Sequence, residues 1–359
     1  MSVGIIYGGK SGEHEVSLHS AYSILKNLST KDYSAVAIGI DKKGVWYLQS
    51  KIEMKNETLK IIRESQQTVA AVPGKGLYVD KRRIKVDIVF PVLHGTFGED
   101  GTIQGLLELA DIPYVGAGVL GSALSMDKDK AKRVWKEAGL PVVPYILLRK
   151  AEFASPHFSL KKFASSALIQ FGLPLFIKPS CAGSSLGVSK IGNAGEMEEA
   201  LALAFTFDTK VLVEPCVNGR EIECSVTGNG DPVAYGPGEI VPHHSFYDYE
   251  AKYIDPNGAE LLLPAKLTKN QAGKLKDIAV KAYKLAEVEG MARVDFFQEK
   301  EKGKILLSEI NTIPGFTNIS MFPKMCEAGG LYYPELLDLL IKHGLERYRE
   351  RKSLRYTYQ

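Results

Sequence analysis

The chain has 359 residues, with 45 Lys and Arg against 42 Asp and Glu, and a formal net charge of +3. This length exceeds one compact core and, at about 100 to 200 residues per domain, predicts two or three domains. The small net charge and the lack of a basic tract argue against nucleic acid or an anionic membrane as a partner, so we expect small-molecule partners.

Residues 1–7 carry no basic leader and only a short apolar run, which predicts a first strand and not a signal peptide. No stretch approaches the roughly 18 apolar residues that span a bilayer. The four cysteines have neither metal-type nor redox-type spacing: Cys181, Cys216, Cys224 and Cys326. These features predict a reduced, cytoplasmic enzyme.

The predicted first strand runs into a Gly-rich segment, residues 8–12, and then a helical pattern up to Leu28. The unpaired amides of a first helical turn favour an anion, but the spacing is not G-x-G-x-x-G, which disfavours a dinucleotide site. Glu15 has two candidate roles. It complements the positive end of the helix, which is the commoner case, or it holds a substrate ammonium group.

Strand and helix signals continue to alternate, with strands at 36–40 and 87–93 and a helix at 102–110. This βαβ series predicts a mostly parallel sheet, whose Gly-rich loops at the carboxyl ends of strands are typical ligand sites. Residues 41–85 are less patterned and are expected to lie over one edge. The pattern changes between residues 116 and 127, which predicts a domain boundary there.

A helix at 127–138 is predicted to start at Asp127 and to end before Gly139 and Pro141. It exposes a set of basic residues, most of which we expect to be solvated: Lys128, Lys130, Lys132, Arg133 and Lys136. Lys128, in the first turn, is a candidate phosphate ligand only on the family grounds given below.

Residues 174–190 form a strand that ends in Lys178 and a loop of small residues. Backbone amides, the hydroxyl groups of Ser184 and Ser185, and the Lys178 ammonium group could bind phosphate. The loop lacks the P-loop motif, and a plain Gly-Ser turn is an alternative that it does not exclude by itself. The strand at 211–214 and the linker after it could present backbone groups to an adenine, with Glu221 placed for ribose.

Residues 243–253 are aromatic and charged without periodicity, which is typical of an active-site cover or of a surface loop with aromatic anchors. A core helix at 268–287 has a capping box formed by Thr268 and Gln271. We expect the terminal helix, residues 334–348, to pack beside it.

Two strand-forming runs flank a charged, Gly-containing segment at 300–304, which predicts a β-hairpin. A turn centred on Lys302 places Asp295 opposite Glu309, and Arg293 opposite Asn311, on one face of the sheet. Oxygen ligands of this kind suit Mg²⁺ with phosphate. A half-exposed sheet with solvated charges is the alternative.

Together the motifs resemble the D-alanine:D-alanine ligases of the ATP-grasp superfamily, in the family's order and over nearly the whole chain. The motifs are GGKSGEHEVS, HGTFGEDGTIQGLLE, MDKDKAK, FIKPSCAGSSLGVSK, FYDYEAKY, RVDFF and EINTIPGFTNIS. The resemblance implies a fold of α/β and α+β domains. An N-terminal parallel-sheet α/β domain, residues 1–122, would precede a two-subdomain ATP-grasp fold with subdomains at 123–215 and 216–359.

The resemblance also implies the reaction: ATP-dependent ligation of two D-alanine molecules through D-alanyl phosphate, for peptidoglycan synthesis. ATP would bind with two Mg²⁺ ions, for which Mn²⁺ could substitute, and the enzyme would be a homodimer. The implied catalytic residues are Glu15, Ser184, Tyr253, Arg293, Gly315 and Ser320. The implied nucleotide ligands are Lys128, Lys178, Ser184, Ser185, Glu214, Val217, Glu221 and Lys252, and the implied metal ligands are Asp295, Glu309 and Asn311.

Two hypotheses stand beside this one. Related ligases that make D-alanyl-D-lactate differ around position 253, so Tyr253 favours the dipeptide, although D-lactate or D-serine as second substrate stays open. A nucleotide-binding protein without catalysis would be expected to lack Arg293 or one of the metal ligands, and all are present. Cys181-Ala182 departs from the charged or polar residues of many relatives and leaves the affinity of the phosphate loop open.

Overall fold

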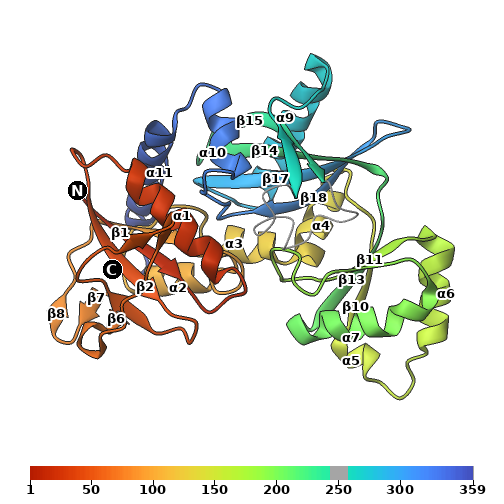
Figure 1. Ribbon diagram of the computed structural model, residues 1–359, viewed down its shortest axis with the longest axis horizontal. Helices are drawn as coiled ribbons and strands as arrows, with labels where there is room; N and C mark the ends of the chain where they lie inside the picture. The colour runs from red at the N-terminus through yellow and green to blue at the C-terminus, as the bar shows by residue number, and fades with distance from the viewer. Residues whose placement is uncertain (243–257, 359) are drawn as a thin grey trace.

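Three lobes, each built on its own sheet, make up the part of the chain that the computed structural model describes, residues 1–242 and 258–358 (Figure 1). The N-terminal sheet has the strand order β3-β2-β1-β9, and β1 pairs in parallel with both β2 and β9. Its strands are β1 (Ser2–Gly8), β2 (Ser34–Ile40), β3 (Trp46–Leu48) and β9 (Ile88–Val92). The predicted parallel sheet is therefore confirmed.

Residues 41–85 cover one edge of this sheet, as the sequence predicts. β3 pairs antiparallel to β2 at the edge, and two small sheets follow it. Their strands are β4 (Met54–Lys55), β5 (Thr58–Leu59), β6 (Val69–Val72), β7 (Gly76–Val79) and β8 (Arg82–Arg83), with a short 3₁₀ turn, η1 (Ser65–Gln67), before β6. The helices of this lobe are α1 (His14–Asn27) and α2 (Thr102–Leu109), and α3 (Val119–Met126) contacts both α2 and the C-terminal lobe.

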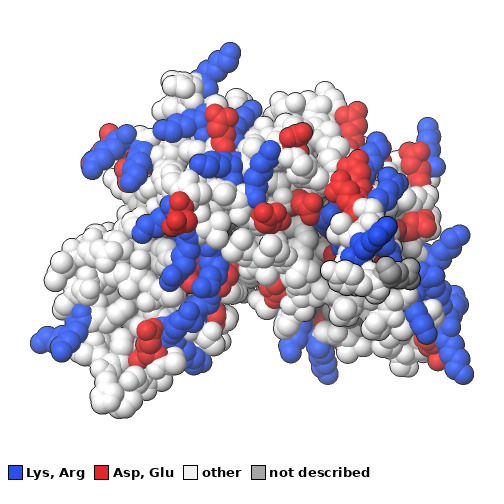
Figure 2. Space-filling model, turned by 180° about the vertical axis from the view of Figure 1, so that it is seen from behind, with Lys and Arg blue, Asp and Glu red and all other residues white. Residues whose placement is uncertain are grey.

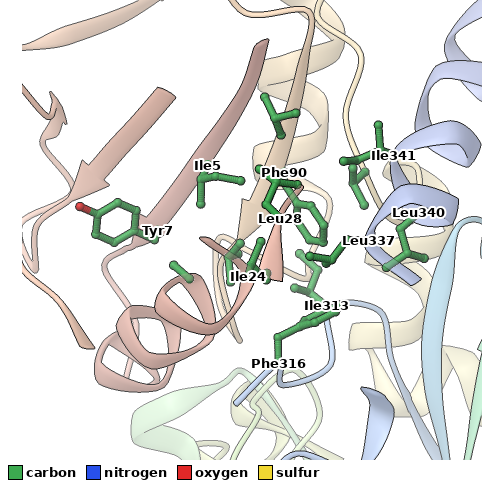
Figure 3. Packing of buried hydrophobic residues seen from close by; sticks show 14 of the residues in the cluster. Ile5, Tyr7, Ile24, Leu28, Phe90, Ile313, Phe316, Leu337, Leu340 and Ile341 are labelled. Carbon is green, nitrogen blue, oxygen red and sulfur yellow. The ribbon is translucent and has the colours of Figure 1, made fainter. Parts of the chain in front are cut away.

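The terminal helix α11 (Tyr333–Lys352) packs on the N-terminal lobe, so the prediction that it lies beside the 268–287 helix is wrong. Figure 3 shows Leu337, Leu340 and Ile341 of α11 against Ile5 and Phe90 of β1 and β9. The spacing of these residues specifies an apolar stripe but not the surface that the stripe covers. That surface comes from a sheet near the other end of the chain.

The central lobe has an antiparallel sheet of order β10-β13-β11-β12. Its strands are β10 (Ile146–Arg149), β11 (Leu175–Pro179), β12 (Ser189–Ile191) and β13 (Lys210–Pro215). Its helices are α5 (Lys150–Phe153), α6 (Leu160–Phe171) and α7 (Met197–Phe207), the last preceded by η2 (Ala194–Glu196). Their apolar faces share one core with the sheet.

The C-terminal lobe has an antiparallel sheet of order β16-β15-β14-β17-β18. Its strands are β14 (Gly219–Thr227), β15 (Val233–Pro242), β16 (Ala259–Leu262), β17 (Met291–Glu299) and β18 (Ile305–Asn311). Two helices, α4 (Lys128–Glu137) and α9 (Lys269–Leu285), pack on one core with this sheet, and α10 (Met321–Ala328) contacts β14 and β15. The predicted capping box of Thr268 and Gln271 starts α9.

The predicted hairpin register is confirmed: Asp295 pairs with Glu309, and Arg293 pairs with Asn311. Toward the turn the register shifts, because Phe296 pairs with Leu307 and Ser308 is the extra residue of a β-bulge. Arg293, Asp295, Glu309 and Asn311 lie on the side of the bulge away from the turn, so they still project from one face of the sheet.

The predicted combination of α/β and α+β units is confirmed. Within residues 1–242 and 258–358, no helix is long and apolar enough to cross a membrane. Lys and Arg side chains lie among Asp and Glu side chains over much of the face shown in Figure 2, in keeping with the small net charge.

Candidate active site

A cavity of about 870 Å³ is lined by residues from all three lobes. It takes in most of the predicted site: Lys128, Lys178, Ser184, Ser185, Glu214, Val217, Glu221, Arg293, Asp295, Glu309, Asn311, Gly315 and Ser320. Lys252 and Tyr253 lie outside the described residues. The fold thus brings segments that are far apart in sequence to one concave surface, which is the usual form of a ligand site.

Glu15 does not line the cavity. Its side chain is 57% exposed and pairs with Lys42 at 2.7 Å, and the hydrogen bond from Lys42 lowers the pKa of the carboxyl group. Glu13, which directly precedes α1, is buried, lines the cavity and accepts a hydrogen bond from the Ser184 hydroxyl group. The glutamate that lines the cavity at the start of α1 is therefore Glu13, two residues before Glu15.

The reason lies in the helical period. Glu13, Ser17 and Ser20 follow each other at intervals of four and three residues, and all three are buried. Glu15 lies on another face of the helix, which points to solvent. A stripe of small polar residues among the apolar ones is the signal that could have selected Glu13.

Asp295 and Glu309 face the cavity from neighbouring strands, and each carboxylate is paired with a cation. Asp295 accepts hydrogen bonds from Arg293 Nε at 2.8 Å and Nη2 at 2.7 Å, and from Asn311 Nδ2 at 2.9 Å. Glu309 Oε2 lies 3.2 Å from Lys128 Nζ. Two carboxylates and an amide oxygen on one face suit a hard divalent cation, although the described residues contain no cluster of three His, Cys, Asp or Glu for a metal.

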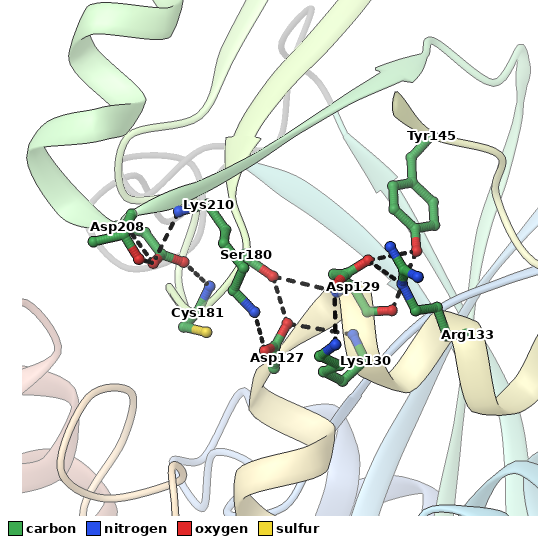
Figure 4. A network of polar contacts seen from close by, with 10 residues as sticks. Asp127, Asp129, Lys130, Arg133, Tyr145, Ser180, Cys181, Asp208 and Lys210 are labelled. Atoms are coloured by element: carbon green, nitrogen blue, oxygen red, sulfur yellow. Dashed lines mark hydrogen bonds and ion pairs between the residues drawn. The ribbon is translucent and has the colours of Figure 1, made fainter. Parts of the chain in front are cut away.

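The start of the phosphate-loop candidate is fixed to the first turn of α4 (Figure 4). Ser180 donates a hydrogen bond to Asp127 at 2.7 Å and accepts one from the Asp129 amide at 3.2 Å. Asp127 also pairs with Lys210, and the Cys181 amide donates to Asp208 at 2.7 Å. These contacts hold the loop and the helix N-terminus together.

The same contacts place Lys128 next to the loop, where its Nζ donates to the carbonyl oxygen of Ala182 at 2.8 Å. A Cβ at Gly183 would lie 2.5 Å from Oε2 of Glu13, so a larger residue there would have to displace that carboxylate. Ser184 and Ser185 then follow with φ angles of 46° and 59°, in the left-handed region. The loop is therefore shaped to approach Glu13 closely.

Glu214 also lines the cavity and lies between two cations. Its Oε2 pairs with Lys178 at 2.6 Å, and its Oε1 pairs with Lys132. The prediction that the 127–138 helix exposes Lys128 and Lys132 is wrong, since Lys128 is buried and the Lys132 side chain has no exposed surface. Burial by itself would raise the pKa of the Glu214 carboxyl group, but the two lysines outweigh it and lower that pKa.

Residues of the N-terminal lobe hold the segment 313–316, which follows the metal-ligand candidates. Glu99 accepts a hydrogen bond from the Ile313 amide at 2.9 Å, and His94 Nδ1 lies 2.8 Å from the Ile313 carbonyl oxygen. The Phe316 amide donates to Ser20 at 3.2 Å. Phe316 itself enters the N-terminal core (Figure 3). No local pattern predicts these contacts, because they join residues that are far apart in the chain.

Two antiparallel sheets that face each other across a cavity, one with Lys178 and the small-residue loop and the other with the oxygen ligands, define an enzyme of the ATP-grasp class. The family models "D-ala D-ala ligase N-terminus" and "D-ala D-ala ligase C-terminus" match residues 2–117 and 134–342. The chain belongs to the D-alanine–D-alanine ligase family. This family comprises ATP-dependent ligases that use a divalent metal ion.

Relatives match over the whole length. A D-alanine–D-alanine ligase of Treponema denticola is 50% identical, with 100% of each chain covered. The D-alanine–D-alanine ligase structure from Coxiella burnetii has a TM-score of 0.83 and 36% identity, covering 98% of this chain and 96% of that one. The VanG D-Ala:D-Ser ligase from Enterococcus faecalis has a TM-score of 0.80 and 35% identity, covering 96% of this chain and 99% of that one.

Proposed function

We propose that the protein joins two D-alanine molecules to D-alanyl-D-alanine for peptidoglycan synthesis. The carboxylate of the first D-alanine attacks the γ-phosphorus of ATP, which gives D-alanyl phosphate and ADP. The amine of the second then attacks the carbonyl carbon, phosphate leaves, and the amine loses a proton. The observation that carries the proposal is the hairpin, whose paired Asp295 and Glu309 line the same cavity as the loop of Ser184 and Ser185.

Phosphate charge is to be neutralised by groups that already line the cavity. Lys128 and Lys178 would contact the phosphates, with Lys252 added from the sequence, and the loop of Ser184 and Ser185 would donate hydrogen bonds. Asp295, Glu309 and Asn311 would hold two Mg²⁺ ions, or Mn²⁺ in their place. The metal would supply positive charge beside the transferred phosphoryl group.

The first D-alanine would be held by its ammonium group. Glu13 takes the role first assigned to Glu15, because Glu13 is the carboxylate in contact with Ser184. Tyr253 would complete this hydrogen-bonded set. Arg293 and the amide of Gly315 would stabilise the oxyanion, and Ser320 would bind the carboxylate of the second substrate.

At the other end of the cavity, Glu214, Val217 and Glu221 would surround adenine and ribose. All three line the cavity beside Phe176, whose ring offers an apolar contact for a base. We propose domain limits of 1–122, 123–215 and 216–359. With these limits, Glu214 belongs to the second domain, and Val217 and Glu221 belong to the third.

We also propose a cytoplasmic homodimer. Four exposed apolar side chains on the adjacent helices α2 and α3 support a contact between two copies: Leu106, Leu109, Val119 and Leu120. Leu109 and Leu120 are 68% and 62% exposed. Exposed apolar side chains that gather on neighbouring helices are typical of a surface that another protein covers.

D-serine is the second candidate for the incoming substrate, because a structure of similar fold is a D-Ala:D-Ser ligase. One reaction decides between them. The protein is incubated with ATP, Mg²⁺ and D-alanine, with D-serine and D-lactate as competitors, and products are read by mass spectrometry together with ADP release. We expect D-alanyl-D-alanine as the main product. If the main product contains D-serine or D-lactate, the assignment of D-alanine as second substrate is wrong. If no ADP is released, the proposed ligase activity is wrong.

A further inference from the structure

Lys132 is a buried cation behind the wall of the cavity. Its side chain has no exposed surface, and it is not among the residues that line the cavity. Its ammonium group contacts the Glu214 carboxylate and donates to the Val143 carbonyl oxygen at 3.2 Å. The same group lies 5.6 Å from the ring centre of Tyr145. A buried ammonium group is costly unless it is paired, so this arrangement requires Glu214 as a partner.

Glu214 has a second cation, Lys178, which differs from Lys132 in its access to the cavity. Lys178 lines the cavity and pairs with Oε2 of Glu214 at 2.6 Å. The two side chains lie diagonally on neighbouring strands, since Lys178 is paired with Leu212 in the sheet. Phosphate oxygens in the cavity would compete for Lys178, whereas Lys132 stays enclosed. Nucleotide binding would then leave Lys132 as the remaining counter-ion and make Oε2 of Glu214 available.

We infer that Lys132 is a positioning residue for purine recognition: it keeps Glu214 charged and fixed by Oε1, so that Oε2 accepts a hydrogen bond from the 6-amino group of adenine. The inference rests on the proposed use of ATP, and it adds a residue that does not itself touch the nucleotide. The role follows from the two-sided geometry of Glu214, with one oxygen turned to a permanent partner and the other to an exchangeable one.

A charged carboxylate discriminates between purines. It accepts a hydrogen bond from the 6-amino group of adenine and repels the 6-carbonyl oxygen of hypoxanthine. Without Lys132, Glu214 would retain Lys178 or take up a proton. In the first case the phosphates lose a ligand, and in the second a neutral carboxyl group can donate to hypoxanthine as well. Loss of Lys132 should therefore reduce the preference for adenine beyond any general loss of affinity.

The test is calorimetric binding of Mg-ADP and Mg-IDP to the full-length protein, without turnover. The wild type should prefer ADP, and Lys132→Met should reduce the ADP:IDP affinity ratio by roughly tenfold or more. Lys130→Met is the matched control, because Lys130 lies on the same helix and its side chain is 52% exposed. Lys132→Gln keeps a hydrogen-bond donor for Glu214 and Val143 without the charge. It gives the same test if the methionine variant does not fold.

A double-mutant cycle with Glu214→Gln separates positioning from packing. If Lys132 acts through Glu214, the Lys132 substitution should change the affinity ratio little in the Glu214→Gln background. An unchanged ratio in both Lys132 variants, with ADP and IDP weakened equally, overturns the inference and leaves the ligase proposal intact. Failure of the wild type to bind Mg-ADP would overturn both.

Discussion

The ammonium group of Lys128 lies 3.2 Å from the carboxylate of Glu309, so a proposed phosphate ligand is paired with a proposed metal ligand. Arg293, which is proposed to stabilise the oxyanion, is likewise paired with the metal-ligand candidate Asp295, and it also lies 3.1 Å from Glu223. Burial of Lys128 would lower its pKa, but Glu309 outweighs burial and raises it. A metal-nucleotide complex would offer both members of the Lys128–Glu309 pair a replacement partner: metal for the carboxylate and phosphate for the cation.

This pairing leads to the first prediction. Asp295→Asn combined with Glu309→Gln should reduce Mg²⁺-dependent ADP release by at least about a hundredfold, because neutral amides are poor ligands for a hard cation. The variant should fold with reduced stability, since the amide oxygens still accept hydrogen bonds from Arg293 and Lys128 while the buried Lys128 loses its charged partner. ADP release against Mg²⁺ concentration and thermal unfolding of the variant are the two measurements. Activity close to that of the wild type would remove the metal assignment.

The second prediction separates two neighbouring carboxylates. Glu13→Gln should raise the KM for the first D-alanine about tenfold or more, because a buried charge that faces the substrate ammonium group is lost. Glu15→Gln is the control and should change KM by less than about twofold, since exposed ion pairs contribute little. Initial rates over a range of D-alanine concentrations test both variants. Equal effects would contradict the assignment of Glu13.

The third prediction concerns association. Leu109→Glu together with Leu120→Glu should shift the protein from dimer to monomer at micromolar concentration, because charges on a closed apolar interface lose their hydration. Sedimentation equilibrium gives the mass. Ile169→Glu is the control, since Ile169 is 88% exposed on the central lobe. A wild type that is already monomeric would contradict the proposed dimer.

Local sequence patterns predicted those features of the fold that depend on neighbouring residues alone. The period of two and the charged turn specified that Asp295 faces Glu309, and the Asp127 cap specified where α4 begins. The bulge at Ser308 was missed because it adds a single residue without a sequence signal of its own. Local composition pointed to the hairpin residues and to the loop of Ser184 and Ser185, whereas other site candidates came only from the family resemblance: Lys128, Glu214, Val217, Gly315 and Ser320.

What the sequence could not supply is which buried surfaces meet. From the sequence, Lys132 is predicted to be one more solvated cation on a charged helix. Only the folded structure shows that it pairs with Glu214 of another lobe. His94 and Ile313 likewise contact each other only after the N-terminal and C-terminal lobes have packed. Glu13 was missed for a different reason: it directly precedes the helix, and the choice between it and Glu15 depends on the helical face.

The last prediction follows from His94, which links helix α1 to the segment after the metal-ligand candidates. His94 Nε2 lies 2.9 Å from the Ser20 hydroxyl oxygen, and Nδ1 lies 2.8 Å from the Ile313 carbonyl oxygen. Only an Nδ1–H group can donate to that carbonyl. Burial lowers the pKa of His94, against the influence of Glu13 and the Ile313 carbonyl, so the folded protein holds it neutral.

In the unfolded chain His94 takes up a proton near pH 6.5, so below that pH the unfolded state binds more protons and the folded state loses stability. Between pH 7.5 and 5.5 the contribution of His94 should reach at most about 1.4 kcal/mol, measured as the difference between the wild type and His94→Gln. Glu13, Glu99 and Arg293, which also act on His94 or its neighbours, remain in both proteins. Urea unfolding at several pH values measures the difference. The exposed His157→Gln variant should retain the wild-type slope, and an equal slope in His94→Gln would show that His94 is not held neutral.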